Sequence, residues 1–341
     1  MHHEFKIRFA NYSDKKNIMF FIGQYWDKDH ILSKDNTFFN FQYYYKKNLQ
    51  FVLAIGADDK IVGILGYIQY FPENKKQDVA LALWKVIPNL PDPLLGLKLI
   101  QYLKKNLNYG NIFCVGINKK VTEIYKFIGF KIGELLHFVA FNKNCKEFKI
   151  SIPPQKIKSL TFSNNWNFKI SKNIPVSLEN LFTQTNYIKK IPFKPKEFII
   201  KRYLNHPYFT YNFHEVFENN FFMGLVISRE VNYSKRKALR IIDILSEDKK
   251  ISEIINEFAN ILNQSHNQYE YVDVYVSNIN INFLTKRNYN LVSSSSKITV
   301  PDYFSPFIKQ NIKIIFCSID SKPICLFKGD GDQDNPRKNI N

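Results

Sequence analysis

One stretch of the sequence, Asn118-Lys-Lys-Val-Thr-Glu-Ile-Tyr-Lys-Phe-Ile-Gly-Phe130, decides the fold. An apolar run over residues 112–117 precedes it and predicts a strand. The stretch itself predicts a helix over residues 120–128, and a further strand is expected over residues 130–141. It therefore indicates a strand–helix–strand unit with Tyr125 within the helix.

Upstream of this unit, strand and helix signals alternate. Strands are expected over residues 5–10, 51–55, 61–70 and 79–87, and helices over residues 13–26, 37–47 and 95–105. The segment Gly56-Ala-Asp-Asp-Lys60 joins two of these strands as a hairpin turn. The order predicts an α/β (α+β) fold in which a mixed central sheet is flanked by helices.

The same order of elements returns in the second half of the chain. Phe39 and Tyr44 recur as Phe198 and Tyr203, and the offset along the chain is the same for both pairs. This recurrence predicts two tandem copies of one fold. We expect a first copy over residues 1–145, a linker over 146–165, a second copy over 166–328 and a polar, solvated C-terminal tail over 329–341.

The stretch around Tyr125 closely resembles the N-x-x-A-x-x-L-Y-x-x-x-G-F signature of the GNAT superfamily of N-acetyltransferases. The hairpin with Gly63 and the loop with Gly96 resemble that superfamily as well, so that the resemblance covers about residues 5–140. It implies two tandem GNAT-like domains, acyl-CoA as co-substrate, and Tyr125 as the general acid for the departing thiolate. A tyrosine hydroxyl can donate such a proton. Ordinary packing of Tyr125 on the sheet is the alternative.

The resemblance also assigns residues to coenzyme A. The amides at the start of the helix over 95–105, together with the helix dipole, suit a diphosphate. The loop lacks the first basic and last small residue of the family pattern, and Lys98 would restore a positive charge. The strand over 79–87 is expected to splay and to pair with the pantetheine arm. The implied contacts are Trp84, Lys85, Val86, Leu95, Gly96, Leu97, Lys98 and Asn118. Trp84 as core and Asn118 as a helix cap remain alternatives.

No general base stands out in the sequence. Asp78, Glu134, His137 and His214 all qualify by residue type, and none stands in a diagnostic motif. His214 and Tyr211 are candidate substrate contacts.

The second copy has lost the residues of the motif. Leu284 replaces Tyr125, and the segment Ser246-Glu-Asp-Lys-Lys250 has no glycine where a diphosphate would lie. We therefore expect a degenerate copy that forms a wall of the acceptor site.

Composition limits the class of protein. Hydrophobic residues make up 45% and charged residues 23%, which is typical of a globular chain. The net charge of +18 is spread without a block of like charges, so we expect small anionic substrates rather than nucleic acid. No apolar run approaches a membrane span, and the polar start does not resemble a signal peptide. The four cysteines form no CxxC pair, which indicates a reduced, cytoplasmic protein without a metal site.

Over the whole chain, the sequence resembles the nucleotide-sugar N-acyltransferases of the GNAT superfamily. This implies transfer of a 3-hydroxybutanoyl or acetyl group from CoA to the amine of a dTDP-linked sugar, dTDP-3-amino-3,6-dideoxy-D-galactose, for surface polysaccharide such as O-antigen. Two alternatives stay open. One is a protein or peptide N-acetyltransferase, and the other is a non-catalytic GNAT scaffold that binds RNA or protein. The oligomeric state is left open.

Overall fold

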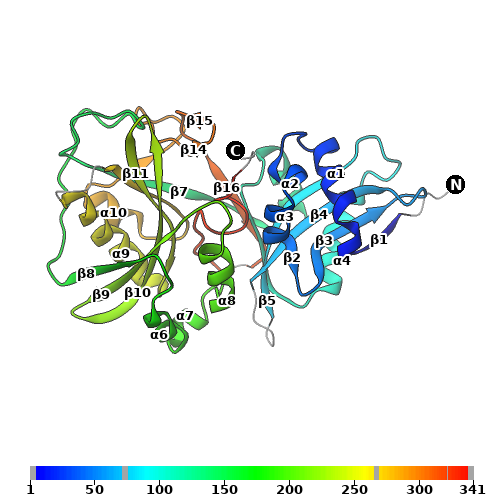
Figure 1. Ribbon diagram of the computed structural model, residues 1–341, viewed down its shortest axis with the longest axis horizontal. Coiled ribbons are helices and arrows are strands. Elements are labelled where there is room, and N and C mark those ends of the chain that lie inside the picture. The colour runs from blue at the N-terminus through cyan, green and yellow to red at the C-terminus, as the bar shows by residue number, and fades with distance from the viewer. Residues whose placement is uncertain (1–4, 71–75, 265–268, 321, 337–341) are drawn as a thin grey trace.

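The computed structural model describes residues 5–70, 76–264, 269–320 and 322–336. Two α/β halves lie side by side, and β7 and β16 lie between them (Figure 1). In the described part of the chain, the strands of both halves join in one sheet of the order β1-β3-β4-β5-β6-β16-β7-β12-β11-β10-β9-β8. None of the helices in these ranges is long and apolar enough to cross a membrane.

The elements follow the alternation that the sequence predicts. The first half contains β1 (Lys6–Asn11), α1 (Lys15–Tyr25), α2 (Ile31–Lys34), α3 (Asn36–Tyr43), β2 (Tyr44–Tyr45), β3 (Asn48–Ile55), β4 (Ile61–Tyr70), β5 (Gln77–Val86), α4 (Leu95–Asn106), β6 (Tyr109–Val115), α5 (Thr122–Phe127) and β7 (Lys131–Phe141). The rest contains β8 (Trp166–Ser171), α6 (Glu179–Phe182), α7 (Thr185–Ile188), α8 (Lys196–Ile199), β9 (Asn212–Glu218), β10 (Phe221–Tyr233), β11 (Arg236–Leu245), α9 (Ile251–Phe258), β12 (Tyr269–Val276), α10 (Ile281–Lys286), β13 (Asn290–Val292), β14 (Tyr303–Phe304), β15 (Phe307–Ile308) and β16 (Ile314–Ser318).

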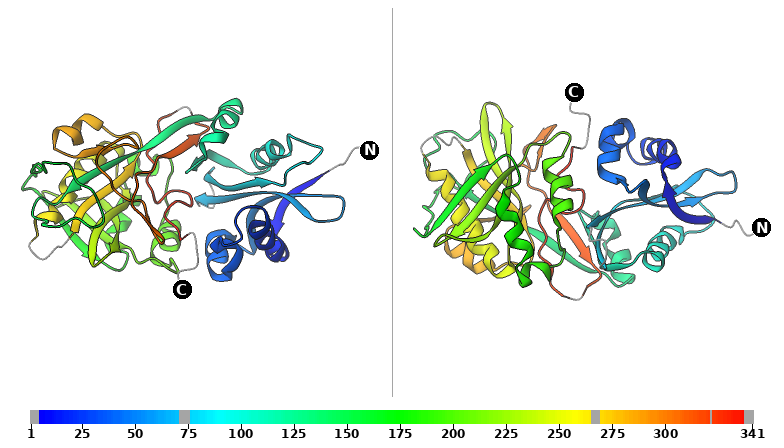
Figure 2. Two further views of the ribbon diagram at one scale, coloured as in Figure 1. Left: turned by 90° about the horizontal axis from the view of Figure 1, so that it is seen from above. Right: turned by 60° about the horizontal axis from the view of Figure 1, so that its bottom comes forward.

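Helices cover both faces of the first half's sheet. Side chains alternate between the faces of a strand. Val52 of β3 and Leu65 of β4 pack with α4, whereas their neighbours Leu53 and Ile64 pack with α1, α2 and α3. Figure 2 shows these two helix layers on opposite sides of the strands. The arrangement leaves the ends of β5 and β6, between the layers, as the place where a site can open.

The predicted duplication is confirmed at the level of the backbone. α5 (Thr122–Phe127) recurs as α10 (Ile281–Lys286), at the same offset that relates Phe39 to Phe198. The turns after these helices also agree, because Gly129 and Asn288 both adopt a left-handed conformation. The predicted helix over residues 37–47 is too long. It ends at Tyr43, and Lys46 and Lys47, both with positive φ, turn the chain back into β3.

The strand β7 is shared by the two halves. Its residues 131–135 pair with β16, and its residues 136–141 pair with β12. In turn, β16 lies between β6 and β7, so that a strand from the end of the chain completes the first half's sheet. The second half likewise takes in a strand of the first. Each predicted domain therefore contains a strand that the other supplies, which the local pattern of the sequence does not indicate.

The prediction of a solvated C-terminal tail is wrong for residues 329–336. Asp330 and Asp334 are both buried. Asp330 accepts a hydrogen bond from the Tyr70 hydroxyl at 3.0 Å, and Asp334 pairs with Arg229 at 2.7 Å. A buried carboxylate needs such partners, and these lie far away in the sequence. Residues 337–341 of the predicted tail lie outside the described residues.

A buried ion cluster ties β7 to the second half. Arg240 of β11 is fully buried and donates to Asp273 of β12 at 2.7 Å and to Asp302 at 3.0 Å. The Asp273 oxygen that accepts at 2.7 Å, Oδ2, is also 2.9 Å from Nε2 of His137 on β7. Burial by itself would raise the pKa of Asp273, but Arg240 and His137 bring that pKa below its ordinary value. Burial would likewise raise the pKa of Asp302, but Lys328 and Arg240 bring it below its ordinary value, so both carboxylates are ionised and depend on these cations.

Replacing this cation should destabilise the fold strongly. We expect Arg240→Ala to lower the free energy of unfolding by about 3–5 kcal/mol, because it leaves Asp273 buried without its cation and Asp302 with Lys328 alone. Urea denaturation followed by circular dichroism measures this. The control is Arg236→Ala at the start of the same strand, where the partly exposed Arg236–Glu147 pair contributes less than about 1 kcal/mol. Equal losses in the two variants would contradict the interpretation.

Candidate functional site

The sheet opens between β5 and β6. These parallel strands pair only as far as Leu81 and Cys114, whereas β5 stays paired with β4 up to Val86. Residues 82–86 therefore turn one backbone edge toward a gap rather than toward a strand. Trp84, Lys85 and Val86 lie at the position that the sequence predicts for a splayed strand.

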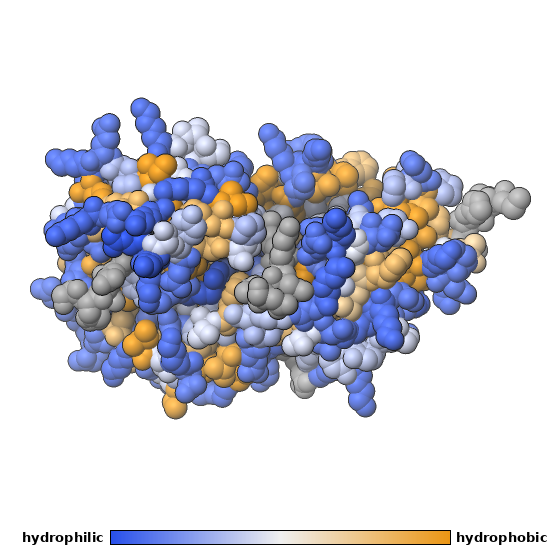
Figure 3. All heavy atoms as spheres, turned by 45° about the horizontal axis from the view of Figure 1, so that its top comes forward, coloured by the Kyte–Doolittle hydropathy of each residue, from blue (hydrophilic) through white to orange (hydrophobic). Residues whose placement is uncertain are grey.

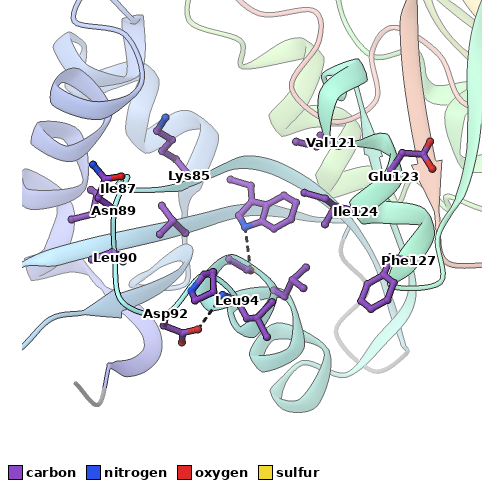
Figure 4. Close-up of a pocket in the computed structure, with 15 residues that line it drawn as sticks. Lys85, Ile87, Asn89, Leu90, Asp92, Leu94, Val121, Glu123, Ile124 and Phe127 are labelled. Carbon is purple, nitrogen blue, oxygen red and sulfur yellow. Dashed lines mark hydrogen bonds between the residues drawn. The ribbon is translucent and has the colours of Figure 1, made fainter. Parts of the chain in front are cut away.

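A first cavity, the α4 pocket, lies beside this gap and has a volume of about 810 Å³. Figure 4 shows its wall, formed by the end of β5, the loop over residues 87–94, the start of α4, and Val121, Ile124 and Phe127 around α5. The indole Nε1 of Trp84 donates to the carbonyl of Gly96 at 3.2 Å. A Cβ at Gly96 would approach the indole to 3.2 Å, so glycine allows α4 to start against this ring.

The start of α4 offers backbone amides to the α4 pocket. The first amides of a helix have no acceptor within the helix. Gly96 and Leu97 line the pocket, but the side chain of Leu95 is buried in the core. Lys98 pairs with Asp92 at 2.7 Å, and Asp92 also accepts from the amide of Leu94. The predicted cation is therefore present at the helix start, already paired with a carboxylate.

A second cavity, the Tyr125 pocket, lies next to the α4 pocket and has a volume of about 780 Å³. Trp84 and Val121 line both cavities. Both halves of the chain contribute to its wall, which includes Trp26, Asp27, His30, Phe38, Leu83, Cys114, Gly116, Asn118, Tyr125, Tyr303, Ile308, Asp332, Gln333 and Asn335. The two cavities therefore adjoin each other at Trp84 and Val121.

Tyr125 lies where the sheet opens. Its side chain is only 2% exposed, and its ring centroid is 5.4 Å from that of Trp84 and 5.3 Å from that of Phe130. Burial raises the pKa of its hydroxyl well above 10, and the neighbouring thiol of Cys114, with which it shares a hydrogen bond, adds to this effect. The hydroxyl is therefore protonated at physiological pH, which is the form that donates a proton.

Asn118 is the helix cap that the sequence suggests as one alternative, and its contact with coenzyme A stays a prediction. Its side-chain oxygen accepts from the amide of Lys120 at 2.9 Å and so caps the turn that leads into α5. Asn118 also lines the Tyr125 pocket.

Two predicted substrate contacts are not brought to this pocket. His214 is buried in the second half, with Nε2 2.8 Å from the Ser228 hydroxyl, and burial lowers its pKa to about 4. Tyr211 is buried as well and donates to the Asp334 carboxylate at 2.8 Å. Neither residue lines either cavity. Both side chains are held inside the second half instead.

The remaining candidate bases also lie away from Tyr125. Asp78 accepts from the amide of Phe193 at 2.9 Å, Glu134 pairs with Lys313, and His137 belongs to the Arg240 cluster. None of the three lines the α4 pocket or the Tyr125 pocket. Among the described residues, no group of three or more His, Cys, Asp or Glu side chains is arranged to hold a metal ion.

Sequence reasoning missed the contribution of the C-terminal segment, which we define as residues 324–336. Asp332 and Gln333 line the Tyr125 pocket, and the side-chain amide of Gln333 donates to the carbonyl of Val115 at 3.0 Å. The only signal was the unusual run Gly329-Asp-Gly-Asp-Gln-Asp334, whose role the sequence alone does not show.

In the second copy, the C-terminal segment occupies the opening between the parallel strands. There, β11 and β12 pair only as far as Ile241 and Val274, and the C-terminal segment enters the gap. The amide of Gly329 donates to the carbonyl of Ile242 at 2.8 Å, and the amide of Ser277 donates to the carbonyl of Leu326 at 2.9 Å. Ile242 and Ser277 correspond to Leu83 and Asn118 at the offset that relates the two copies. At these equivalent positions, the second copy binds the backbone of the C-terminal segment, which turns at Gly329.

Comparison with known proteins supports the fold. No known protein family and no curated protein matches the sequence. A solved GCN5-related N-acetyltransferase from Anabaena variabilis matches 92% of this chain and 72% of its own, with a TM-score of 0.55 and 13% identity. A protein of unknown function from Enterococcus faecalis, described as a probable N-acyltransferase, matches the same shares with a TM-score of 0.53 and 8% identity. The chain thus has the predicted tandem GNAT-like fold.

The raised pKa of Tyr125 can be measured directly. We expect no difference in tyrosinate absorbance at 295 nm between the native protein and Tyr125→Phe up to about pH 10, the ordinary pKa of tyrosine. The buried hydroxyl of Tyr125 should ionise only above that pH. One extra tyrosine titrating at or below pH 10 in the native protein would contradict the description of this site.

Proposed function

We propose that the chain is an acyl-CoA-dependent N-acyltransferase with one active site, in the first copy. The observation that carries this proposal is the position of Tyr125. A buried, protonated phenol faces the point where β5 and β6 separate, and the start of α4 lies across the α4 pocket. An acid, an opening for an extended ligand and a set of helix-start amides are thus gathered around two adjoining cavities.

The proposed position of acyl-CoA follows from these parts. The diphosphate binds at the amides of Gly96 and Leu97, where the helix dipole favours an anion. The pantetheine arm pairs with the free edge of residues 82–86. The second copy supports this assignment, because its equivalent edge already accepts a backbone hydrogen bond from another segment at Ile242. Trp84, between the two cavities, then lies alongside the arm.

The chemistry that we propose is direct transfer. The nitrogen of a neutral amine attacks the thioester carbonyl, and backbone amides of residues 82–86 bind the oxyanion of the tetrahedral intermediate. When the carbon–sulfur bond breaks, the thiolate takes the proton of the Tyr125 hydroxyl. The proton that leaves the new amide nitrogen then returns to the tyrosinate.

The acceptor binds in the Tyr125 pocket. The finer prediction, dTDP-3-amino-3,6-dideoxy-D-galactose with 3-hydroxybutanoyl-CoA, rests on sequence resemblance. Among the described residues that line this pocket there is no lysine or arginine to pair with a nucleotide diphosphate. We therefore propose an amine as acceptor and treat the sugar nucleotide as one member of the panel to be tested.

Removing the proposed acid should stop turnover without disturbing binding. We expect Tyr125→Phe to lower kcat by about 10²-fold or more while the Kd for acyl-CoA changes little, since the ring and its packing are kept. Thiol release with acetyl-CoA and 3-hydroxybutanoyl-CoA measures kcat. The control Tyr102→Phe removes a hydroxyl from α4 of the same copy and should retain full activity. An unchanged kcat in Tyr125→Phe would remove Tyr125 from the mechanism.

The same assay separates the competing functions. The acceptor panel contains small primary amines, dTDP- and UDP-linked amino sugars, and peptides with free amino groups. Turnover of peptides alone would favour a protein N-acetyltransferase. Hydrophilic residues are spread over both halves on the face seen in Figure 3. Salt-sensitive RNA binding without turnover of any amine would favour the binding scaffold and would refute our proposal.

Binding stoichiometry tests the assignment to the first copy. We expect isothermal titration calorimetry to give one acyl-CoA per chain, because the C-terminal segment already fills the opening of the second copy. Two equivalent sites would contradict this. Gly96→Asp, which places a carboxylate at the amides of α4, should abolish the one site, and Gly56→Asp in the exposed hairpin is its control.

A further inference from the structure

The gap between β5 and β6 is bordered by two strand edges, and the first free backbone acceptor on the β6 edge is Val115. Successive residues of a strand turn their N–H and C=O groups to opposite neighbours. The amide of Gly116 donates to the carbonyl of Ile315 at 2.8 Å, on the side of β16. Val115 precedes Gly116 and therefore faces β5. Because the pairing of β5 with β6 ends at Cys114, the carbonyl of Val115 lies just beyond the paired part.

The side chain of Gln333 closes this edge. Its Nε2 donates to the carbonyl of Val115 and to Oδ1 of Asp332, each at 3.0 Å, so both N–H bonds of the amide are used. The amide lies directly over the backbone of Gly116, where a Cβ would be 2.2 Å from Nε2. Gly116 has a φ of +82°, which glycine adopts readily, and it leaves room for this approach. The amide thus takes the place along β6 that the backbone of a paired strand would occupy.

Gln333 is fixed in this position by buried ion pairs on either side of it in the chain. Before it, Asp330 pairs with Lys194 at 2.9 Å. After it, Asp334 pairs with Arg229 at 2.7 Å. Both carboxylates are buried, and both cations belong to the second half of the chain. The second half therefore holds Gln333 against β6 of the first.

In the second copy, the corresponding edge pairs with a chain segment. Val276 of β12 forms an antiparallel bridge with Phe327. The amide of Ser277 donates to the carbonyl of Leu326 at 2.9 Å. The edge of β12 thus binds another segment through its backbone, as free strand edges commonly do. In the first copy, the side chain of Gln333 covers the equivalent edge instead.

We propose that Gln333 selects the acceptor: it prevents an extended peptide from pairing with β6, so that the acceptor is a compact amine held by the side chains of the Tyr125 pocket. The inference rests on the proposed function and names its substrate class. With the pantetheine arm on residues 82–86 of β5 and Gln333 on β6, both edges of the gap are occupied. Gln333 is a specificity-determining residue and takes no part in the proton transfer.

The Tyr125 pocket suits a compact molecule. Its volume of about 780 Å³ lies within the range of small-molecule sites. Trp26 and Phe38 from the first half of the chain and Ile308 from the second line it with apolar surface. An amine that enters this pocket is bound by contacts with side chains, and it needs no backbone of its own to pair with a strand.

Opening the edge of β6 should shift the selectivity toward peptides. In the native protein, we expect kcat/KM for the best small primary amine of the panel to exceed that for tetra-alanine. Gln333→Ala should lower the ratio of the two values by about fivefold or more, the effect of one net backbone hydrogen bond gained by the peptide. Thiol release with acetyl-CoA measures both values. The Kd for acetyl-CoA should stay within about twofold, because Gln333 does not line the α4 pocket.

A second variant separates the hydrogen bond from the bulk of the side chain. Gln333→Glu keeps the size, but a carboxylate cannot donate to the carbonyl of Val115 and would lie beside the carboxylate of Asp332. We expect it to turn away and to change the ratio in the same direction as Gln333→Ala. Gln155→Ala, in an exposed part of the connecting segment, is the control and should match the native ratio. An unchanged ratio in both Gln333 variants, with native thermal midpoints, would overturn the role of Gln333.

A binding measurement tests the closed edge without turnover. We expect isothermal titration calorimetry, with CoA at saturation, to show that acetyl-tetra-alanine amide binds Gln333→Ala more tightly than the native protein. Equal affinities would overturn the closure of β6. A native protein that prefers tetra-alanine to every small amine would also overturn this inference, but it would leave the N-acyltransferase function standing. If the native protein turns over neither amines nor peptides, the proposed function fails instead, whereas the binding comparison still reports on the edge of β6.

Discussion

The pairing of β7 with strands from both halves is the constraint on which the rest of the structure depends. One end of β7 pairs with β16 and the other with β12, so neither sheet is complete without the other. The buried Arg240–Asp273–His137 cluster holds the second end in place. Once β16 is inserted beside β6, the chain that follows it runs between the halves and reaches first the gap of the second copy, then the Tyr125 pocket. The position of Asp332 is therefore a consequence of strand pairing.

The two copies share one backbone arrangement, but the gap between their parallel strands is open in the first copy and filled in the second. In both, two parallel strands separate after equivalent residues, Leu81 with Cys114 in the first and Ile241 with Val274 one step further in the second. The first copy keeps its gap open beside Tyr125, and two cavities meet there. The second copy has Leu284 in place of that tyrosine, and the C-terminal segment fills its gap. The opening that stays free in the first copy is thus filled in the second by the segment whose Asp332 and Gln333 line the Tyr125 pocket.

Local patterns in the sequence predicted the elements and several residues that line the two cavities of the first copy. The alternation of apolar residues located β4 and α4, and the motif around Tyr125 located α5 and the turn at Gly129. The constant offset between matching residues of the two halves predicted the duplication. The sequence could not predict that β7 pairs with the second half and β16 with the first. Pairing between residues far apart in the chain leaves no periodic pattern in the local sequence. Asp330 and Asp334 were predicted to be solvated for the same reason. Their partners Tyr70 and Arg229 lie far away in the sequence. His214 and Tyr211 were singled out by residue type, which does not indicate burial.

The late position of β16 in the chain has a consequence for synthesis. A ribosome makes the helices and strands around Tyr125 first, yet the edge of β6 stays uncovered until residues 314–318 emerge. Until then, the first copy is an open sheet edge of the kind that promotes aggregation. The Tyr125 pocket gains Asp332 only after nearly all of both copies has been translated, so its wall is completed at the end of translation. A chain cut short anywhere before β16 would lack both the strand that covers β6 and this part of the pocket wall.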